Sequence, residues 1–216
     1  AFGYQALLAN TTGTNNCAFG QGTLQTNITG TTNSAFGTLA LRDNTGEANS
    51  AVGYASMLTN TEGANNIAMG VSSLRVNTSG GNNVALGTNA LTANTTASNN
   101  TAVGYNVGVA VTTGANNQLF GQGAGSTLTT GANNTLVGTL AGSYDGTDIT
   151  TGTRNHLFGN FTKVAAAASA DAIVIGYYIT SKGNQTGFIS PGGGPVYQGN
   201  NSSTWSTTSD RRLKKN

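Results

Sequence analysis

The sequence predicts an all-β fold, a repetitive β-solenoid or β-helix with coils of about 17 residues. Three observations lead to this prediction. An apolar residue followed by glycine recurs every 17 residues, an asparagine stands four positions before most of these glycines, and the composition is dominated by 32 Gly, 35 Thr and 28 Asn in 216 residues. Charged residues make up only 7% of the chain, against about 25% in average soluble domains. A unit this short and this rich in Gly and Asn does not fit a helical repeat.

The repeat is defined by glycines that each follow Phe, Val, Met, Leu or Ile. They are Gly3, Gly20, Gly37, Gly53, Gly70, Gly87, Gly104, Gly121, Gly138, Gly159 and Gly176. Successive glycines are 17 residues apart, except for spacings of 16 before Gly53, 21 before Gly159. We expect short strands separated by turns, with the apolar residue before each glycine stacked into a core column.

Two columns of asparagine accompany the glycines. The first lies four residues before them, at Asn16, Asn33, Asn49, Asn66, Asn83, Asn100, Asn117, Asn134 and Asn155. The second lies seven residues after them, at Asn10, Asn27, Asn44, Asn60, Asn77 and Asn94. Gly and Asn both accept the positive φ of tight turns, and stacked Asn side chains can hydrogen-bond from coil to coil as a ladder.

Two further columns change together and suggest a division of the chain. From Ala18 to Ala102 the residue two before the glycine is Ala, and the residue four after it is mostly Leu; from Gly121 onward these become Leu and Gly. Such an exchange conserves volume, as neighbours in one packed layer must. We therefore predict solenoid repeats of the Ala/Leu type over residues 1–104 and of the Leu/Gly type over residues 105–176.

The longest spacing marks an insertion near residues 143–150, which we expect to form a protruding loop. Asp145 and Asp148 lie in this loop and are candidates for ligand contact. Two carboxylates are too few for a calcium site, which needs six or more oxygens. After residue 176 the period stops, so residues 177–209 are predicted to be an irregular β cap or linker.

Charge and composition exclude several function classes. The net charge of +2 comes from the basic end of the chain, because residues 1–209 contain five basic and six acidic residues; we expect no nucleic-acid partner. No apolar run is long enough for a membrane-spanning helix. Cys17 is the single cysteine, so neither an intrachain disulfide nor a thiolate metal site is expected. We predict no cofactor and no metal. Cys17 and His156 occupy one column of the repeat, as ordinary members of it.

Tyrosines follow four of the repeat glycines, at Tyr4, Tyr54, Tyr105 and Tyr177. Their rings are candidates for stacking on sugars, although packing on the flank of the solenoid explains them equally well. Because faces rich in Gly and Ala allow close approach, and a lone solenoid has a thin core and two open ends, we predict a parallel homotrimeric fibre.

The run G-x-N-N-x-A-φ-G, where φ is an apolar residue, resembles the coil motif of the head domains of trimeric autotransporter adhesins. It is also similar to the Asn-, Gly- and Thr-rich repeats of phage tail fibres, and it covers residues 1–176. The resemblance implies a stiff, trimeric, extracellular shaft.

The end of the chain carries a second resemblance. Ser209-Asp210-Arg211-Arg212-Leu213-Lys214-Lys215-Asn216 resembles the opening of the intramolecular chaperone and self-cleaving peptidase domain of phage tail spikes and fibres. The resemblance implies that residues 210–216 begin this domain and that the bond between Ser209 and Asp210 is cut. It assigns the nucleophile to Ser209 and its proton acceptor to Lys214, in keeping with the activation that a serine hydroxyl needs.

The expected function is therefore structural and receptor-binding, in a phage tail fibre or spike on the virion tail that contacts other tail proteins and a host glycan or outer-membrane receptor. The chain starts within a repeat, so we expect it to be part of a longer polypeptide. The alternatives are a bacterial trimeric surface adhesin, a polysaccharide-degrading spike, for which acids are few, and an ice-binding solenoid, for which Thr is expected to drift between columns. No substrate turnover is expected.

Overall fold

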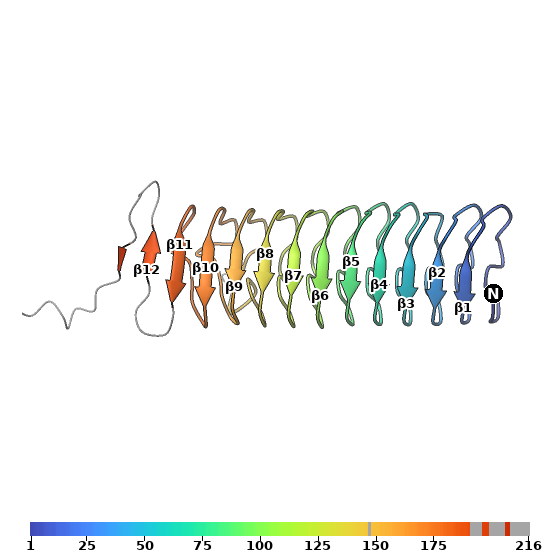
Figure 1. The fold of residues 1–216 in the computed structure, drawn as a ribbon, viewed down its shortest axis with the longest axis horizontal. Coiled ribbons are helices and arrows are strands. Elements are labelled where there is room, and N and C mark those ends of the chain that lie inside the picture. Colours follow the sequence, from blue (N-terminus) through green and yellow to red (C-terminus); the bar gives the residue numbers. More distant parts are fainter. Residues whose placement is uncertain (147, 191–195, 199–205, 208–216) are drawn as a thin grey trace, which may run out of the picture.

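A computed structural model describes residues 1–146, 148–190, 196–198 and 206–207, and it contains thirteen short strands in one sheet (Figure 1). The predicted all-β solenoid is confirmed. In chain order the strands are β1 (Cys17–Phe19), β2 (Ser34–Phe36), β3 (Ser50–Val52), β4 (Ile67–Met69), β5 (Val84–Leu86), β6 (Thr101–Val103), β7 (Gln118–Phe120), β8 (Thr135–Val137), β9 (His156–Phe158), β10 (Ile173–Gly176), β11 (Gly187–Ser190), β12 (Val196–Gln198) and β13 (Ser206–Thr207). The described residues contain no helix that could span a membrane.

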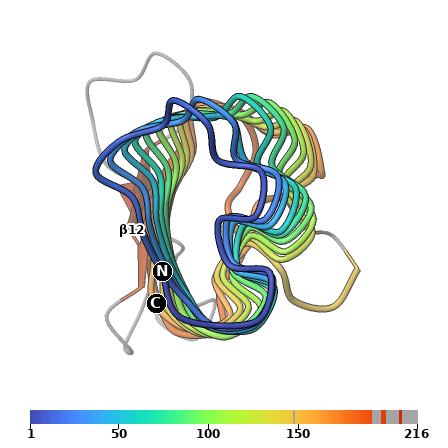
Figure 2. The same ribbon diagram turned by 90° about the vertical axis from the view of Figure 1, so that its right-hand side faces the viewer.

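Each strand from β1 to β10 pairs in parallel with the strand of the next coil, in sequence order. The register follows the repeat, as when Ala18 lies opposite Ala35. The coils therefore stack one on another within a single chain, with an axial advance of about 4.8 Å per coil. Viewed along the axis, the coils superimpose as a tube whose strands form one wall (Figure 2).

The parallel sheet continues for one coil beyond the end of the 17-residue period. β11 pairs in parallel with β10, and Gly187 lies opposite Ile173, so this last coil is shorter than the others. The pairing then reverses, because β12 runs antiparallel to β11 and β13 antiparallel to β12. Residues 177–190 are thus solenoid in structure, and antiparallel strands follow them.

Backbone turns with positive φ close every coil. The repeat glycines have φ between +123° and +151°, a region that residues with a Cβ rarely adopt. A Cβ on Gly20 would lie 2.8 Å from the carbonyl carbon of Gly37 in the next coil. Glycine is needed here both for its backbone conformation and for the close stacking of coils.

The first column of asparagine forms a buried ladder through the structure. Asn66 is fully buried, and its Nδ2 donates to the carbonyl oxygen of Gly80 at 2.9 Å and to Asn49 Oδ1 at 3.2 Å. Its Oδ1 accepts from the backbone N–H of Asn83 at 2.9 Å. The ladder thus satisfies backbone groups that the turns leave without a partner inside the coil.

The second column forms another ladder that ends within the chain. Asn77 Nδ2 donates to Asn60 Oδ1 at 2.6 Å, and Asn94 Nδ2 donates to Asn77 Oδ1 at 2.7 Å. The next coil has Val111 in this column, which offers no donor, and Asn94 Oδ1 is buried with no hydrogen bond. Beyond this point the column is apolar and buried, at Val111, Leu128 and Ile149.

The interior columns exchange volume where the predicted second set of repeats begins. A Cβ on Gly125 would lie 3.1 Å from Leu119 Cδ2 and 3.2 Å from Leu136 Cδ1. Leu119 and Leu136 therefore fill the space that Leu24 and its equivalents occupy in earlier coils, where the strand centre is Ala.

The expectation that the apolar residue before each glycine stacks in the core is wrong. In each three-residue strand the central residue is buried and its two neighbours are more exposed, because side chains alternate across a sheet. The column before the glycine lies outside. Its most exposed members are Phe2, Phe19, Phe36, Val52, Met69, Phe120, Phe158 and Ile175.

Replacing Asn66 by Ala should lower the free energy of unfolding by about 2–4 kcal/mol, because the N–H of Asn83 and the carbonyl of Gly80 would be buried without partners. Urea unfolding followed by circular dichroism measures the loss. Asn65→Gly is the matched control, since Asn65 is exposed with φ of +58°. Equal losses in the two variants would contradict a stabilising role for the ladder.

Gly125→Ala should destabilise the chain by about 1–3 kcal/mol through strain at φ +60° and crowding against Leu119. In a Leu119→Ala background the additional loss should be smaller, because the crowding leucine is gone. A double-mutant cycle in urea measures the coupling. Gly146→Ala is the control for strain alone, since Gly146 has φ of +88° and nothing within 4 Å of an added Cβ. Strict additivity would contradict the volume exchange.

Candidate functional site

The self-cleavage residues Ser209, Asp210 and Lys214 lie outside the described residues. Their assignment as nucleophile, scissile partner and proton acceptor therefore stays a prediction from the resemblance.

The three tyrosines singled out as candidate ligand contacts are all exposed, at 71% for Tyr4, 53% for Tyr54 and 54% for Tyr105. They lie in one column but in separate coils, so the fold does not bring them together. Tyr105 also lines a small hollow of about 300 Å³. The other lining residues are Asn106, Val109, Gln122, Gly123, Ser126 and Leu140.

The insertion projects from the side of the tube opposite the strand wall (Figure 2). Asp145 Oδ1 accepts a 2.8 Å ion-paired hydrogen bond from Lys163 Nζ. Asp148 Oδ1 is buried and has no hydrogen-bond partner. The two acids do not converge with a third ligand, since no group of three His, Cys, Asp or Glu side chains occurs in the described part of the chain.

Four aromatic rings meet beside the insertion, and we call Tyr144, Phe161, Tyr177 and Tyr178 the aromatic cluster. The ring centroids of Tyr144 lie 4.9 Å from Phe161 and 5.2 Å from Tyr178, both edge to face. Phe161 and Tyr177 are 5.9 Å apart. The Tyr144 and Tyr178 hydroxyls are 3.2 Å apart, and this hydrogen bond raises the pKa of Tyr144 above its usual value.

Sequence reasoning identified only Tyr177 of this cluster. The available signal was that Phe161 and Tyr178 both stand two residues after a repeat glycine, in adjacent coils, with a tyrosine in the insertion between their columns. The ring contacts themselves depend on the path of the inserted loop, which the period does not specify.

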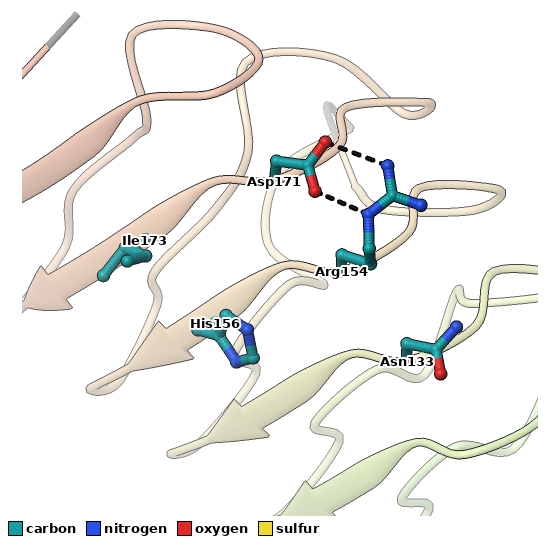
Figure 3. A pocket seen from close by; sticks show the side chains of 5 residues that line it. All are labelled: Asn133, Arg154, His156, Asp171 and Ile173. Atoms are coloured by element: carbon teal, nitrogen blue, oxygen red, sulfur yellow. Dashed lines mark hydrogen bonds and ion pairs between the residues drawn. The ribbon is translucent and has the colours of Figure 1, made fainter. Parts of the chain in front are cut away.

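A shallow depression of about 590 Å³ lies beside β9 and β10 (Figure 3). It is lined by Asn133, Arg154, His156, Asp171 and Ile173. Arg154 holds Asp171 through Nε to Oδ1 at 2.6 Å and Nη2 to Oδ2 at 2.9 Å, which lowers the pKa of Asp171. The carboxylate is thus occupied by the guanidinium. His156 has no second histidine or free acid among these lining residues, and no acid–base pair is formed.

The strand wall is apolar on its outer face, and we call this surface the strand face. Its first rings stack along the axis, with centroids 4.9 Å apart for Phe2 and Phe19 and 6.1 Å apart for Phe19 and Phe36. Apolar residues also occupy the other outward column, where Ile67 is 42% and Ile173 is 44% exposed. Cys17 and His156 lie in that column and are exposed.

Threonine does not drift between columns in the way the sequence analysis expected. The residue after the second asparagine column is threonine in nearly every coil. Its hydroxyl donates to the carbonyl of the next coil at Thr11, Thr45, Thr61, Thr78, Thr95, Thr112 and Thr129. These hydroxyl protons hold coils together instead of pointing into solvent.

Comparison of the chain with protein-family models, curated proteins and solved structures finds no match.

Proposed function

We propose that the chain is a structural and receptor-binding segment of a trimeric phage tail fibre or spike, located on the virion tail and mediating host attachment. The observation that carries the proposal is the strand face, an apolar surface that extends along the solenoid. Monomeric proteins rarely expose large contiguous apolar patches, which usually mark interfaces. Phe19, Phe36, Val52 and Met69 follow one another on this face from coil to coil.

The periodicity of the strand face supports a second copy of the chain as its partner. Its side chains recur at the coil spacing of about 4.8 Å, and a parallel copy presents the same spacing along its whole length. A closed ring buries this face on every subunit and leaves no open association surface. The number three comes from the resemblance to adhesin heads and tail fibres.

The interior supports the role of a stiff shaft. Two asparagine ladders and a continuous parallel sheet tie each coil to the next, so bending requires breaking buried hydrogen bonds. Catalysis of substrate turnover is not part of the proposal, because Asp171 is held by Arg154 and Asp145 by Lys163. A trimeric bacterial adhesin remains the alternative, and the gene region downstream distinguishes it by encoding a membrane-anchoring barrel.

Ice binding is the one alternative for which the structure adds an observation, since threonine does form a column. The hydroxyls of Thr61, Thr78 and Thr95 donate to backbone carbonyls at 3.0 to 3.2 Å. Internal donation favours a structural role for the column, and the attachment proposal stands ahead of ice binding.

The purified chain should be a trimer, and Phe36→Asp combined with Met69→Asp should convert it to monomers, because the buried strand face would carry unpaired charges. Native mass spectrometry measures the stoichiometry, and circular dichroism checks that the monomer keeps its β structure. Ile28→Asp is the matched control, since Ile28 is 49% exposed and lies in the threonine column, outside the strand face. A monomeric wild type, or a double variant that stays trimeric, would overturn the proposed assembly.

Maturation by self-cleavage is tested with the chain expressed together with the coding sequence that follows it in its gene. The product should end at Ser209, and Ser209→Ala should leave the precursor uncut, because the hydroxyl is the nucleophile that the resemblance assigns. Intact-mass measurement locates the new C-terminus. Ser203→Ala serves as the control and should be cut normally. Cleavage of the Ser209→Ala precursor would contradict the assignment.

A further inference from the structure

We propose that the aromatic cluster is a binding site for a neutral saccharide. The inference rests on the proposed attachment function and names the chemistry that the receptor would present. Sugar rings combine an apolar face with a rim of hydroxyl groups, and a site for them needs exposed aromatic surface next to neutral hydrogen-bonding groups. Tyr144, Phe161, Tyr177 and Tyr178 offer both.

The rings of the cluster are exposed although they pack on one another. Tyr177 is 68% and Tyr178 is 57% exposed. Their contacts with Tyr144 and Phe161 fix the rings in orientations that are tilted or perpendicular to each other. A ligand would therefore meet preoriented aromatic surface, which reduces the entropy lost on binding.

The solenoid itself does not require aromatic side chains at these positions. Phe161 and Tyr178 have φ of +56° and +57°, a left-handed conformation that is unfavourable for bulky residues. The same column contains Asn89, Asn106 and Gly123 in earlier coils, which accept that conformation more readily. Strained placement of aromatic residues at the surface is typical of functional sites.

The insertion completes the cluster, because it supplies Tyr144. Without Tyr144, Phe161 and Tyr178 would be 6.1 Å apart with no third ring between their columns. The cluster thus coincides with the one place where the repeat gains residues. It lies at the loop on the far side from the strand face (Figure 2), so assembly through the strand face would leave it accessible.

Charge in and around the cluster favours a neutral ligand. The phenols of Tyr144 and Tyr178 share a hydrogen bond of 3.2 Å, and each retains lone pairs for sugar hydroxyls. The nearby Lys163 ammonium is paired with Asp145 at 2.8 Å, so neither charge is available to select an anionic sugar. The phenol of Tyr144 remains protonated at neutral pH, because its pKa is raised.

The hollow beside Tyr105 extends the same edge of the solenoid. Leu140 lines it and stands in the column of Phe161, one coil earlier. An oligosaccharide bound on the aromatic cluster would therefore find a further concave surface along the axis.

The test uses the purified full chain with maltohexaose, cellohexaose, mannohexaose and chitohexaose as probes, each examined by saturation-transfer NMR and titration calorimetry. At least one probe should bind, and Tyr177→Ala combined with Tyr178→Ala should weaken it by about tenfold or more through loss of ring contact. Tyr177→Phe combined with Tyr178→Phe should retain most of the affinity. Tyr54→Ala, in the same column without the cluster, should bind as the wild type does.

Two results would overturn the proposal: no binding of any of the four probes, or unchanged affinity in the double alanine variant. Native mass spectrometry of the same samples reports the trimer independently. A trimer that binds no probe would refute the saccharide site and leave the fibre assembly intact, whereas a monomer would refute the assembly.

Discussion

The buried asparagine ladder is the interaction on which the rest of the fold depends. A coil of 17 residues turns too tightly for its backbone groups to pair with one another, so side chains inside the coil must satisfy them. Asn66 does this with one carboxamide, which bonds the coil before it and the coil after it. A side chain that must reach the same neighbours in every coil imposes a fixed register, and glycine is then required where coils approach most closely.

The small interior that the ladder encloses decides where large side chains can lie. Only one apolar column beside the strands can hold a leucine-sized residue in a given coil, so Leu119 requires Gly125, and Ala18 allows Leu24. Aromatic residues do not fit and remain outside, at Phe19 and the positions equivalent to it. The apolar strand face is thus a consequence of a thin core, and assembly is the way such a surface leaves water.

The sequence was sufficient to predict the period, the ladders and the paired change of two columns, because each depends on spacing alone. It was insufficient for the direction of the strands' side chains. Size suggested that Phe19 points inward, whereas alternation in a three-residue strand buries only the central Ala18. The aromatic cluster was missed because Tyr144 and Phe161 meet through a loop whose path no periodic rule describes. Ser209 and Lys214 lie outside the described residues, and their roles remain predictions.

The position of the insertion explains how a binding loop can be added without loss of the solenoid. Its base is closed by the bond from the N–H of Ile149 to the carbonyl of Gly142 at 2.9 Å. The first ladder crosses the insertion unbroken, since the N–H of Asn155 still donates to Asn134 Oδ1 at 3.0 Å. The second ladder has already been replaced by apolar residues at this level, so the longer turn interrupts no asparagine contact. Extra residues are therefore tolerated at a coil whose stacking does not depend on them, and that freedom allows a variable loop on an otherwise invariant shaft.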